Sequence, residues 1–302
     1  MRILQLCHRV PYPMTDGGNI AMMNLADSLS SQGAEIKMLT LNTVKHRVHL
    51  NTLPQEFIKK YSLEAVNIDT TIKIVSGLAN LFSSESYNIV RFYSTAFEEK
   101  LRQLLTLSSF DIILLESIFM SPYINCIRKN SKAKIVLRAH NVEYIIWQRL
   151  TDSEKNIFKR AYLSLLTKRL KRYELDVMNK VDAILPITPD DEQTFKQSGC
   201  RAPLHVTPVG VNASEYPNQI NEKSELSLFH LGAMDWMPNL EGVNWFLDDC
   251  WNDIHSKFPT LKLYLAGRGF PSALLNNAPN GVICEGEIAD AKEYMSGKQI
   301  MI

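Results

Sequence analysis

The stretch RILQLCHRVPYPMTDGGNIAMMNLADSLSS, residues 2–31, decides the fold. It starts with a short apolar run at 3–7 and ends with a helical pattern at 20–31. Between them lies a loop with two prolines, followed by Asp16-Gly17-Gly18. An apolar strand, a loop and a helix in this order are typical of a βα unit in an α/β protein.

The same alternation continues along the chain. Helical patterns cover 158–181 and 239–257, and continuous Val/Ile/Leu runs suit parallel strands that are covered on both faces. The sequence therefore predicts a doubly wound α/β architecture. The remaining predicted strands are 35–41, 65–68, 112–115, 134–138, 183–187, 204–208, 227–231, 262–266 and 282–284.

A change of composition marks a domain boundary. The stretch VTPVGVNASEYPNQINEKSE is rich in Asn, Pro, Ser and charged residues, and a new strand–loop–helix pattern follows it. We predict an N-terminal domain at 1–206 and a C-terminal domain at 207–302. The second domain would then hold few strands and end on the apolar run GKQIMI, so we expect it to be incomplete.

Composition excludes several classes of protein. The 302 residues include 33 Lys and Arg against 32 Asp and Glu, a net charge of +1 that does not favour nucleic-acid binding. Five scattered cysteines fit reduced thiols, and no run has the length of a signal-peptide core or a membrane span. We therefore expect a cytoplasmic protein, with contact at the inner face of the membrane left open. The seven histidines are dispersed, and no metal site is predicted.

Three groups in the N-terminal domain follow predicted strands. Asp16, Gly17 and Gly18 precede a helix whose N-terminal amides could bind a phosphate or diphosphate. The alternative is a plain turn in which Asp16 caps the helix. His140 and Glu116 each follow a strand, where ligands of open α/β sheets bind. His140 could act on a sugar hydroxyl, whereas Glu116 could equally be a helix cap or a surface group.

Two loops of the C-terminal domain also follow predicted strands. Gly232 begins the segment GAMDWMPN, and Arg268 lies in Gly-Arg-Gly after the run LKLYLA. An arginine suits a diphosphate or ribose, although a surface turn is an equal alternative. Trp236 could cover a ligand or fill an interface.

The helix predicted between residues 155 and 180 is strongly basic. It has eight Lys and Arg against two acids, and apolar residues recur on one face. A basic amphipathic helix can lie on an anionic membrane, but such a face more often packs on the protein core. The apolar residues are Phe158, Tyr162, Leu166, Leu170, Tyr173 and Val177.

Taken in order, several segments resemble the retaining glycosyltransferases of family 4. The N-terminal domain contributes PYPMTDGGNI, RAHNVE and YELDVMNKVDAILPITPDDEQTF. VTPVGV resembles the family's hinge, with Val209 where Asn is usual, and FHLGAMDWMPNLEGVNWF and VICEGEIADAKEY follow.

The resemblance implies a GT-B fold, in which two Rossmann-like domains face a cleft. It implies a nucleotide-sugar donor such as a UDP- or GDP-sugar, a saccharide or lipid-linked acceptor, and metal-independent transfer with retention in polysaccharide or glycolipid biosynthesis. The matching motifs imply that Gly17 and Gly18 contact the donor diphosphate and that His140 contacts the transferred sugar. Arg268 and the loop at Gly286 would lie near the nucleotide, while no motif supports Glu116.

Two departures from the family pattern qualify this prediction. GAMDWMPN lacks the cations that many members carry there, and the family's paired glutamates are expected beyond Ile302. We therefore expect the chain as given to transfer sugar weakly or not at all. Two alternatives stay open: an epimerase or sugar-phosphate synthase of the same fold, and a non-catalytic nucleotide-sugar-binding module.

Overall fold

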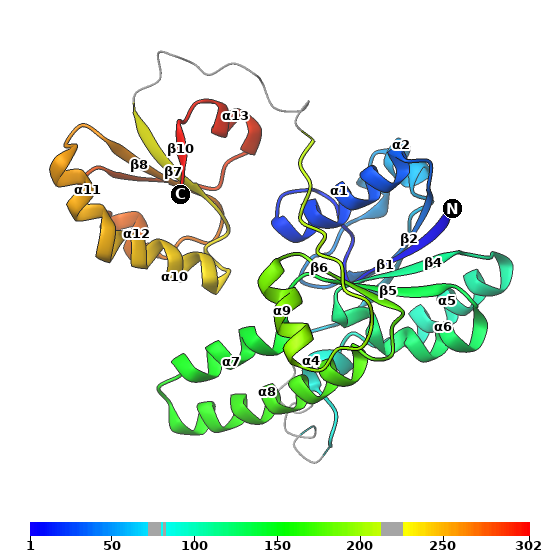
Figure 1. Cartoon of the computed structure of the whole chain (residues 1–302). Helices are drawn as coiled ribbons and strands as arrows, with labels where there is room; N and C mark the ends of the chain where they lie inside the picture. Colours follow the sequence, from blue (N-terminus) through cyan, green and yellow to red (C-terminus); the bar gives the residue numbers. More distant parts are fainter. Residues whose placement is uncertain (72–79, 81–82, 213–225) are drawn as a thin grey trace. The chain divides into compact units, whose positions relative to one another are not determined.

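The computed structural model describes residues 1–71, 80, 83–212 and 226–302 of the chain. These residues divide into two compact units, Met1–Gly210 and Val211–Ile302, each built on its own parallel sheet (Figure 1). The predicted domains meet at 206/207. Residues 213–225 of the predicted linker lie outside the described residues.

Six parallel strands form the sheet of the first unit, in the order β3-β2-β1-β4-β5-β6. Their carboxyl ends share one edge because Glu116 of β4 lies between Cys7 of β1 and Arg138 of β5. Strands β2 and β3 are added on one side of β1, and β4, β5 and β6 on the other, so the strand order reverses at β1. Ligands of open α/β sheets bind at such a reversal point. The strands are β1 (Arg2–Cys7), β2 (Glu35–Thr43), β3 (Glu64–Ile68), β4 (Ile112–Glu116), β5 (Lys134–Ala139) and β6 (Ala183–Pro186).

Helices cover both faces of this sheet because successive strand residues point to opposite sides. Leu4 and Leu6 pack with side chains of α5, α6, α8 and α9, whereas Ile3 and Met38 pack with α1 and the region of α2. Burial on both faces explains why the strands read as continuous apolar runs. The helices are α1 (Gly17–Ser31), α2 (Gln55–Lys60), α4 (Tyr87–Val90), α5 (Thr95–Leu107), α6 (Ile124–Asn130), α7 (Glu143–Ser153), α8 (Ile157–Val177) and α9 (Pro189–Gln197), with short 3₁₀ turns at Leu50–Thr52 and Ile118–Tyr123.

The second unit has a smaller sheet of four parallel strands, in the order β10-β7-β8-β9. Trp251 is completely buried in its core, and its indole Nε1 donates a hydrogen bond to the carbonyl oxygen of Asn280 at 2.9 Å. The strands are β7 (Ser227–Leu231), β8 (Lys262–Ala266), β9 (Val282–Gly286) and β10 (Ile300–Met301). The helices are α10 (Met237–Trp245), α11 (Asn252–Lys257), α12 (Ser272–Asn276) and α13 (Ala291–Ser296), with a π-helical turn at Phe246–Trp251 between α10 and α11.

Two predicted elements differ from the structure. Residues 204–208 form no strand: Leu204 makes a bridge to β6, but the next bridge is incomplete because Pro186 of β6 has no amide hydrogen to donate, although Thr207 donates to its carbonyl oxygen at 2.8 Å. The helix predicted at 239–257 starts earlier and is interrupted by the π-helical turn. Among the described helices, none combines the length and apolar composition needed to cross a bilayer.

Candidate functional site

Glu116 and His140 form a hydrogen-bonded pair at the carboxyl edge of the first sheet. Glu116 ends β4 and His140 follows β5, the next strand, and His140 Nε2 lies 2.6 Å from Glu116 Oε2. Glu116 is fully buried, and Gln5 Nε2 donates to its other oxygen at 2.7 Å. Burial alone would raise the pKa of Glu116, but the hydrogen bond from His140 and the charges of His140 and Arg138 lower it.

This pairing fixes the orientation of the His140 ring. An ionised carboxylate only accepts hydrogen bonds, so Nε2 of His140 carries a proton toward Glu116. In the neutral ring, Nδ1 is then the nitrogen that can accept a hydrogen bond. The side chain of His140 keeps 11% of its surface exposed, whereas Glu116 has none. His140 can therefore meet a ligand directly, and Glu116 can act only through it.

A third residue, His8, completes the cluster and was not predicted from the sequence. His8 follows β1, and its ring centroid lies 6.1 Å from that of His140 in an edge-to-face arrangement. Its Nδ1 is 3.1 Å from the carbonyl oxygen of Glu116. Burial, with the nearby charges of His140 and Arg9, lowers the pKa of His8 to about 3, so its ring stays neutral. Its position directly after a strand is the signal that could have identified it.

Buried polar side chains connect this cluster to the first turns of α1. Arg138 Nη1 donates to the carbonyl oxygen of Ala21 at 2.8 Å, and Gln5 Nε2 donates to that of Met22 at 3.2 Å. Both side chains are 1% exposed. The start of α1, which carries the predicted glycines, is therefore held at the edge where Glu116 and His140 lie.

At the start of α1, Asp16 is a helix cap, the alternative considered for it. Its Oδ1 accepts the amide hydrogen of Asn19 at 3.0 Å and pairs with Arg9 Nη2 at 2.5 Å. Gly18 leaves room for this arginine, since a Cβ there would lie 2.4 Å from Arg9 Nη2. Gly17 is exposed, with no atom within 4 Å of an added Cβ. The helix N-terminus is thus open to a ligand at Gly17, whereas Arg9 fills the space beside Gly18.

A second carboxylate fixes the helix that follows His140. Glu174 of α8 is 2% exposed and accepts the backbone amides of Glu143 and Tyr144, at 3.1 and 2.9 Å. Burial raises the pKa of Glu174 to about 8 despite these two hydrogen bonds, and the charge of Glu143 adds to the rise. Burial also raises the pKa of Glu143 to about 7. Glu174 lies in the segment YELDVMNK, which the motif comparison quoted without assigning it a role.

The predicted residues of the second unit meet at the carboxyl edge of its own sheet. The Gly232 amide donates to the carbonyl oxygen of Ala266 at 3.0 Å, and the Gly267 amide donates to that of Gly286 at 2.7 Å. A Cβ on Gly267, whose φ is +133°, would lie 1.9 Å from the Gly232 carbonyl oxygen. Glycine is therefore required where these backbones meet.

Arg268 projects from this glycine-lined edge. Its Nε lies 3.4 Å from Asp235 Oδ1, and both side chains are more than a third exposed. The structure thus brings Gly232, Arg268 and Gly286 together in one unit, and Asp16, Gly17, Gly18, Glu116 and His140 in the other. Among the described residues, no group of three or more His, Cys, Asp or Glu side chains could hold a metal ion.

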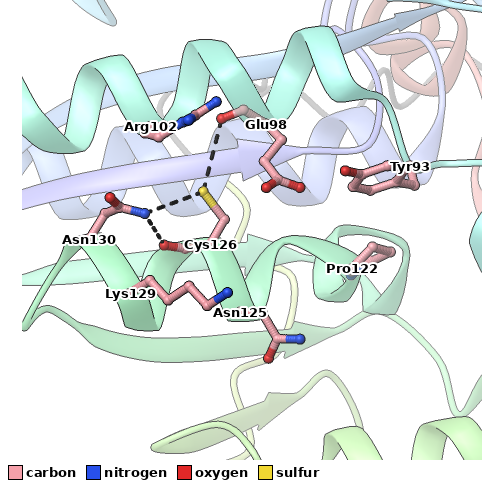
Figure 2. A pocket seen from close by; sticks show the side chains of 8 residues that line it. All are labelled: Tyr93, Glu98, Arg102, Pro122, Asn125, Cys126, Lys129 and Asn130. Carbon is pink, nitrogen blue, oxygen red and sulfur yellow. Dashed lines mark hydrogen bonds between the residues drawn. The ribbon is translucent and has the colours of Figure 1, made fainter.

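The pocket drawn in Figure 2 contains none of these residues. It has a volume of about 530 Å³ and lies between α5 and α6, with Glu98, Arg102 and Lys129 among its lining. Cys126 at its wall donates weakly to the Glu98 carbonyl oxygen, and burial raises the pKa of its thiol. A thiol that stays protonated is a poor nucleophile.

Comparison with known proteins identifies the fold. No family model matches the chain. A curated relative, an uncharacterized 44.6 kDa protein in the cps region of Klebsiella pneumoniae, is 23% identical over 288 residues, which are 93% of this chain and 66% of that protein. The chain thus spans just under two thirds of the length of this relative.

The solved structures that match almost the entire chain include the following three. Sucrose-phosphate synthase from Thermosynechococcus elongatus matches with a TM-score of 0.66 and 12% identity, over 100% of this chain and 75% of its own. TarM from S. aureus, in complex with Fondaparinux, alpha-GlcNAc-glycerol and UDP, matches with a TM-score of 0.61 and 9% identity, over 99% of this chain and 80% of its own. Anabaena HepE in complex with UDP-glucose matches with a TM-score of 0.59 and 13% identity, over 100% of this chain and 73% of its own.

These neighbours are glycosyltransferases of the GT-B class, and the chain shares their fold. The predicted α/β architecture with two Rossmann-like domains is confirmed. At such low identity the likeness defines the fold and leaves the chemistry to be argued from the site.

Proposed function

We propose that the chain is a glycosyltransferase that takes a sugar from a nucleotide-sugar donor and transfers it to a saccharide or lipid-linked acceptor. The shared GT-B fold and structural neighbours solved with UDP or UDP-glucose support this proposal. The relative named for a cps region supports a role in polysaccharide biosynthesis. Residues 1–206 would then serve the acceptor, and residues 207–302 the nucleotide sugar.

The observation that carries the proposal is the Glu116–His140 pair. A nucleotide sugar reacts when its diphosphate leaves the anomeric carbon, and positive charge then develops on the sugar ring. His140, oriented by the buried Glu116 carboxylate at 2.6 Å, would hold a hydroxyl of that sugar through Nδ1. The neutral His8 beside it adds no positive charge that would oppose the developing cation.

Each unit, taken by itself, offers groups suited to the charge of a diphosphate. The amides of Gly17 and Gly18 lie at the N-terminus of a fifteen-residue helix, where the helix dipole favours an anion. Arg268 in the second unit offers a guanidinium suited to phosphate oxygens. Gly232 and Gly286 would let a nucleotide approach the backbone closely. We propose that these groups act without a metal ion and that the anomeric configuration is retained.

Donor binding and donor turnover test the proposal separately. Isothermal titration calorimetry of the 302-residue chain with UDP-glucose and GDP-mannose measures binding. Release of UDP or GDP, with and without an oligosaccharide acceptor, measures turnover, both in this chain and in a version extended by a segment that carries the family's paired glutamates. His140→Ala should lower turnover by roughly 100-fold or more, while Glu116→Gln should lower it less. His49→Ala, at an exposed histidine, is the matched control.

Two results would contradict the proposal. Unchanged turnover in His140→Ala would remove His140 from the reaction. Donor binding without any turnover, both in the unmodified chain and in a version extended by a segment that carries the family's paired glutamates, would identify a nucleotide-sugar-binding module in place of an enzyme. Retention is tested by the anomeric configuration of the product, read by NMR, and metal independence by activity in excess EDTA.

A further inference from the structure

The outer face of α8 carries a second stripe of residues that the core does not use. The buried stripe comprises Leu163, Leu166, Leu170 and Val177, so most of the apolar face predicted from the sequence lies on the core. Its first residue does not, because Phe158 is 87% exposed. The neighbouring Ile157 is 80% exposed.

Helical periodicity extends this exposed pair along α8. Phe158, Ala161, Leu165, Lys168 and Arg172 recur every three or four residues and therefore share one face. All are exposed except the half-buried Leu165. The face thus begins with apolar side chains and continues with two cations. We call these five residues together with Ile157 the outer stripe.

The surroundings of the apolar end are also basic. Lys155, Lys159 and Arg160 are exposed beside Ile157 and Phe158, and Lys159 pairs with Glu154 at 2.5 Å. Residues 154–160 therefore carry three cations against one acid. An exposed apolar pair beside three cations is complementary to a surface that has an apolar layer beneath anionic groups. A bilayer containing anionic lipid has that composition.

The outer stripe lies at the end of a hairpin formed by α7 and α8. The two helices pack side by side and are joined by residues 154–156 (Figure 1). α7 begins at Glu143, three residues after His140, and its eleven residues extend roughly 16 Å at the usual rise of an α-helix. The apolar end of the outer stripe is thus separated from the carboxyl edge of the sheet by about the length of one helix.

We propose that the outer stripe of α8 binds the surface of an anionic bilayer, with Ile157 and Phe158 inserted below the headgroups and Lys168 and Arg172 bound to lipid phosphates. The helix, 21 residues long, would lie along the membrane surface while its opposite face stays on the core. This surface goes beyond the proposed function, because vesicle binding needs neither a donor nor an acceptor. Loss of sugar transfer would leave it standing.

Co-sedimentation of the 302-residue chain with vesicles tests this proposal. We expect binding to equimolar phosphatidylcholine and phosphatidylglycerol, and little binding to phosphatidylcholine alone. The double variant Ile157→Ser, Phe158→Ser should lose roughly 100-fold or more in partition coefficient, from the lost burial of two large apolar side chains. Lys168→Ser with Arg172→Ser should lose about 25-fold, at about fivefold for each cation, and should weaken the salt dependence.

Leu107→Ser is the matched control. Leu107 is 81% exposed at the end of α5, outside the outer stripe, so its replacement should change vesicle binding less than twofold. Circular dichroism melting curves of all variants check that they fold. As an independent measurement, Phe158→Trp should gain fluorescence quenching by brominated phosphatidylglycerol, which shows insertion directly.

Three outcomes would overturn the proposal. One is equal binding of the Ile157/Phe158 double variant and the unmodified chain to anionic vesicles. Another is an equal loss of binding in Leu107→Ser. The third is a concentration-dependent dimer, seen by sedimentation velocity, that the double variant abolishes. That result would identify the outer stripe as a contact between two copies of the chain.

Discussion

The carboxyl edges of the two sheets are built from different chemical groups. In the first unit, the edge is built from buried polar side chains: Gln5, Glu116 and Arg138 lie beneath His8 and His140. In the second unit, the edge is built from glycine backbone at the ends of β7, β8 and β9. The first edge therefore depends on the pairing of charges and the second on the close approach of backbone segments.

This difference predicts where a substitution should be most damaging. At the glycine edge, a Cβ added to Gly267 should disrupt the fold of the unit, whereas an exposed side chain there can be replaced without such loss. At the charged edge, removal of a single buried charge should by itself lower the stability of the unit, even when the side chain keeps its shape.

The largest effect is expected for Gly267→Ala. The new Cβ would lie 1.9 Å from the Gly232 carbonyl oxygen, at a backbone φ of +133° that residues with a side chain rarely adopt. Backbone displacement and strain should lower the free energy of unfolding by about 4 kcal/mol or more. Urea denaturation followed by tryptophan fluorescence measures this. Gly242→Ala in α10, with no atom within 4 Å of the new Cβ, should stabilise by up to ~1 kcal/mol. Equal effects of the two variants would refute the close-approach argument.

The next effect is expected for Glu116→Gln. The amide keeps the shape but removes the anion that pairs with His140 and faces the buried Arg138. We expect a loss of about 3 kcal/mol at pH 7, as for breaking other buried ion pairs. Glu56→Gln at an exposed position should change stability by less than about 0.5 kcal/mol.

The pH dependence of this loss checks its cause. Because the folded-state pKa of Glu116 is lowered, its contribution is fully present above the ordinary glutamate pKa of 4.5. The contribution disappears as the pH falls through the folded-state pKa. The stability difference between the unmodified chain and Glu116→Gln should therefore shrink in acid. A difference that is constant with pH would exclude the charge as its origin.

A smaller effect of opposite sign is expected for Glu174→Gln at alkaline pH. The pKa of Glu174 is raised from 4.5 to about 8, so the folded state holds a proton that the unfolded state has lost. Stability contributed by this group falls as the pH rises from about 4.5 to 8. Glu174→Gln should remove this decline and gain on the order of 1–2 kcal/mol at pH 8 relative to pH 6.5. Denaturant midpoints across this pH range measure it, and parallel pH profiles would contradict the prediction.

The smallest effect on stability is expected for Arg268→Gln. Its contact with Asp235 at 3.4 Å is exposed, so the free energy of unfolding should change by less than about 0.5 kcal/mol. Binding of UDP measured by calorimetry should nevertheless weaken about tenfold, because a guanidinium contact with phosphate is lost. Unchanged UDP binding would remove Arg268 from the proposed donor site.

Sequence patterns predicted much of this architecture. Continuous apolar runs located the parallel strands, since burial on both faces leaves little room for polar residues. Glu116 and His140 were each recognised because they follow such runs. Their 2.6 Å contact was not predictable, because it requires β4 and β5 to be neighbours in register. His8 also follows such a run, but its approach to His140 depends on the placement of β1 beside β4.

The sequence by itself determined that the chain forms α/β units, with glycines, a histidine and an arginine at strand ends. That information is local, since it rests on periodicity and on the residues that turns and helix starts require. Only the tertiary structure decided that Glu116 is completely buried, that Glu174 holds the start of α7 and that Gly267 touches Gly232. It also separated the two faces of α8, with the apolar stripe on the core and Phe158 outside. Burial and the pairing of charges depend on segments far apart in the chain, and no local pattern encodes which of them will meet.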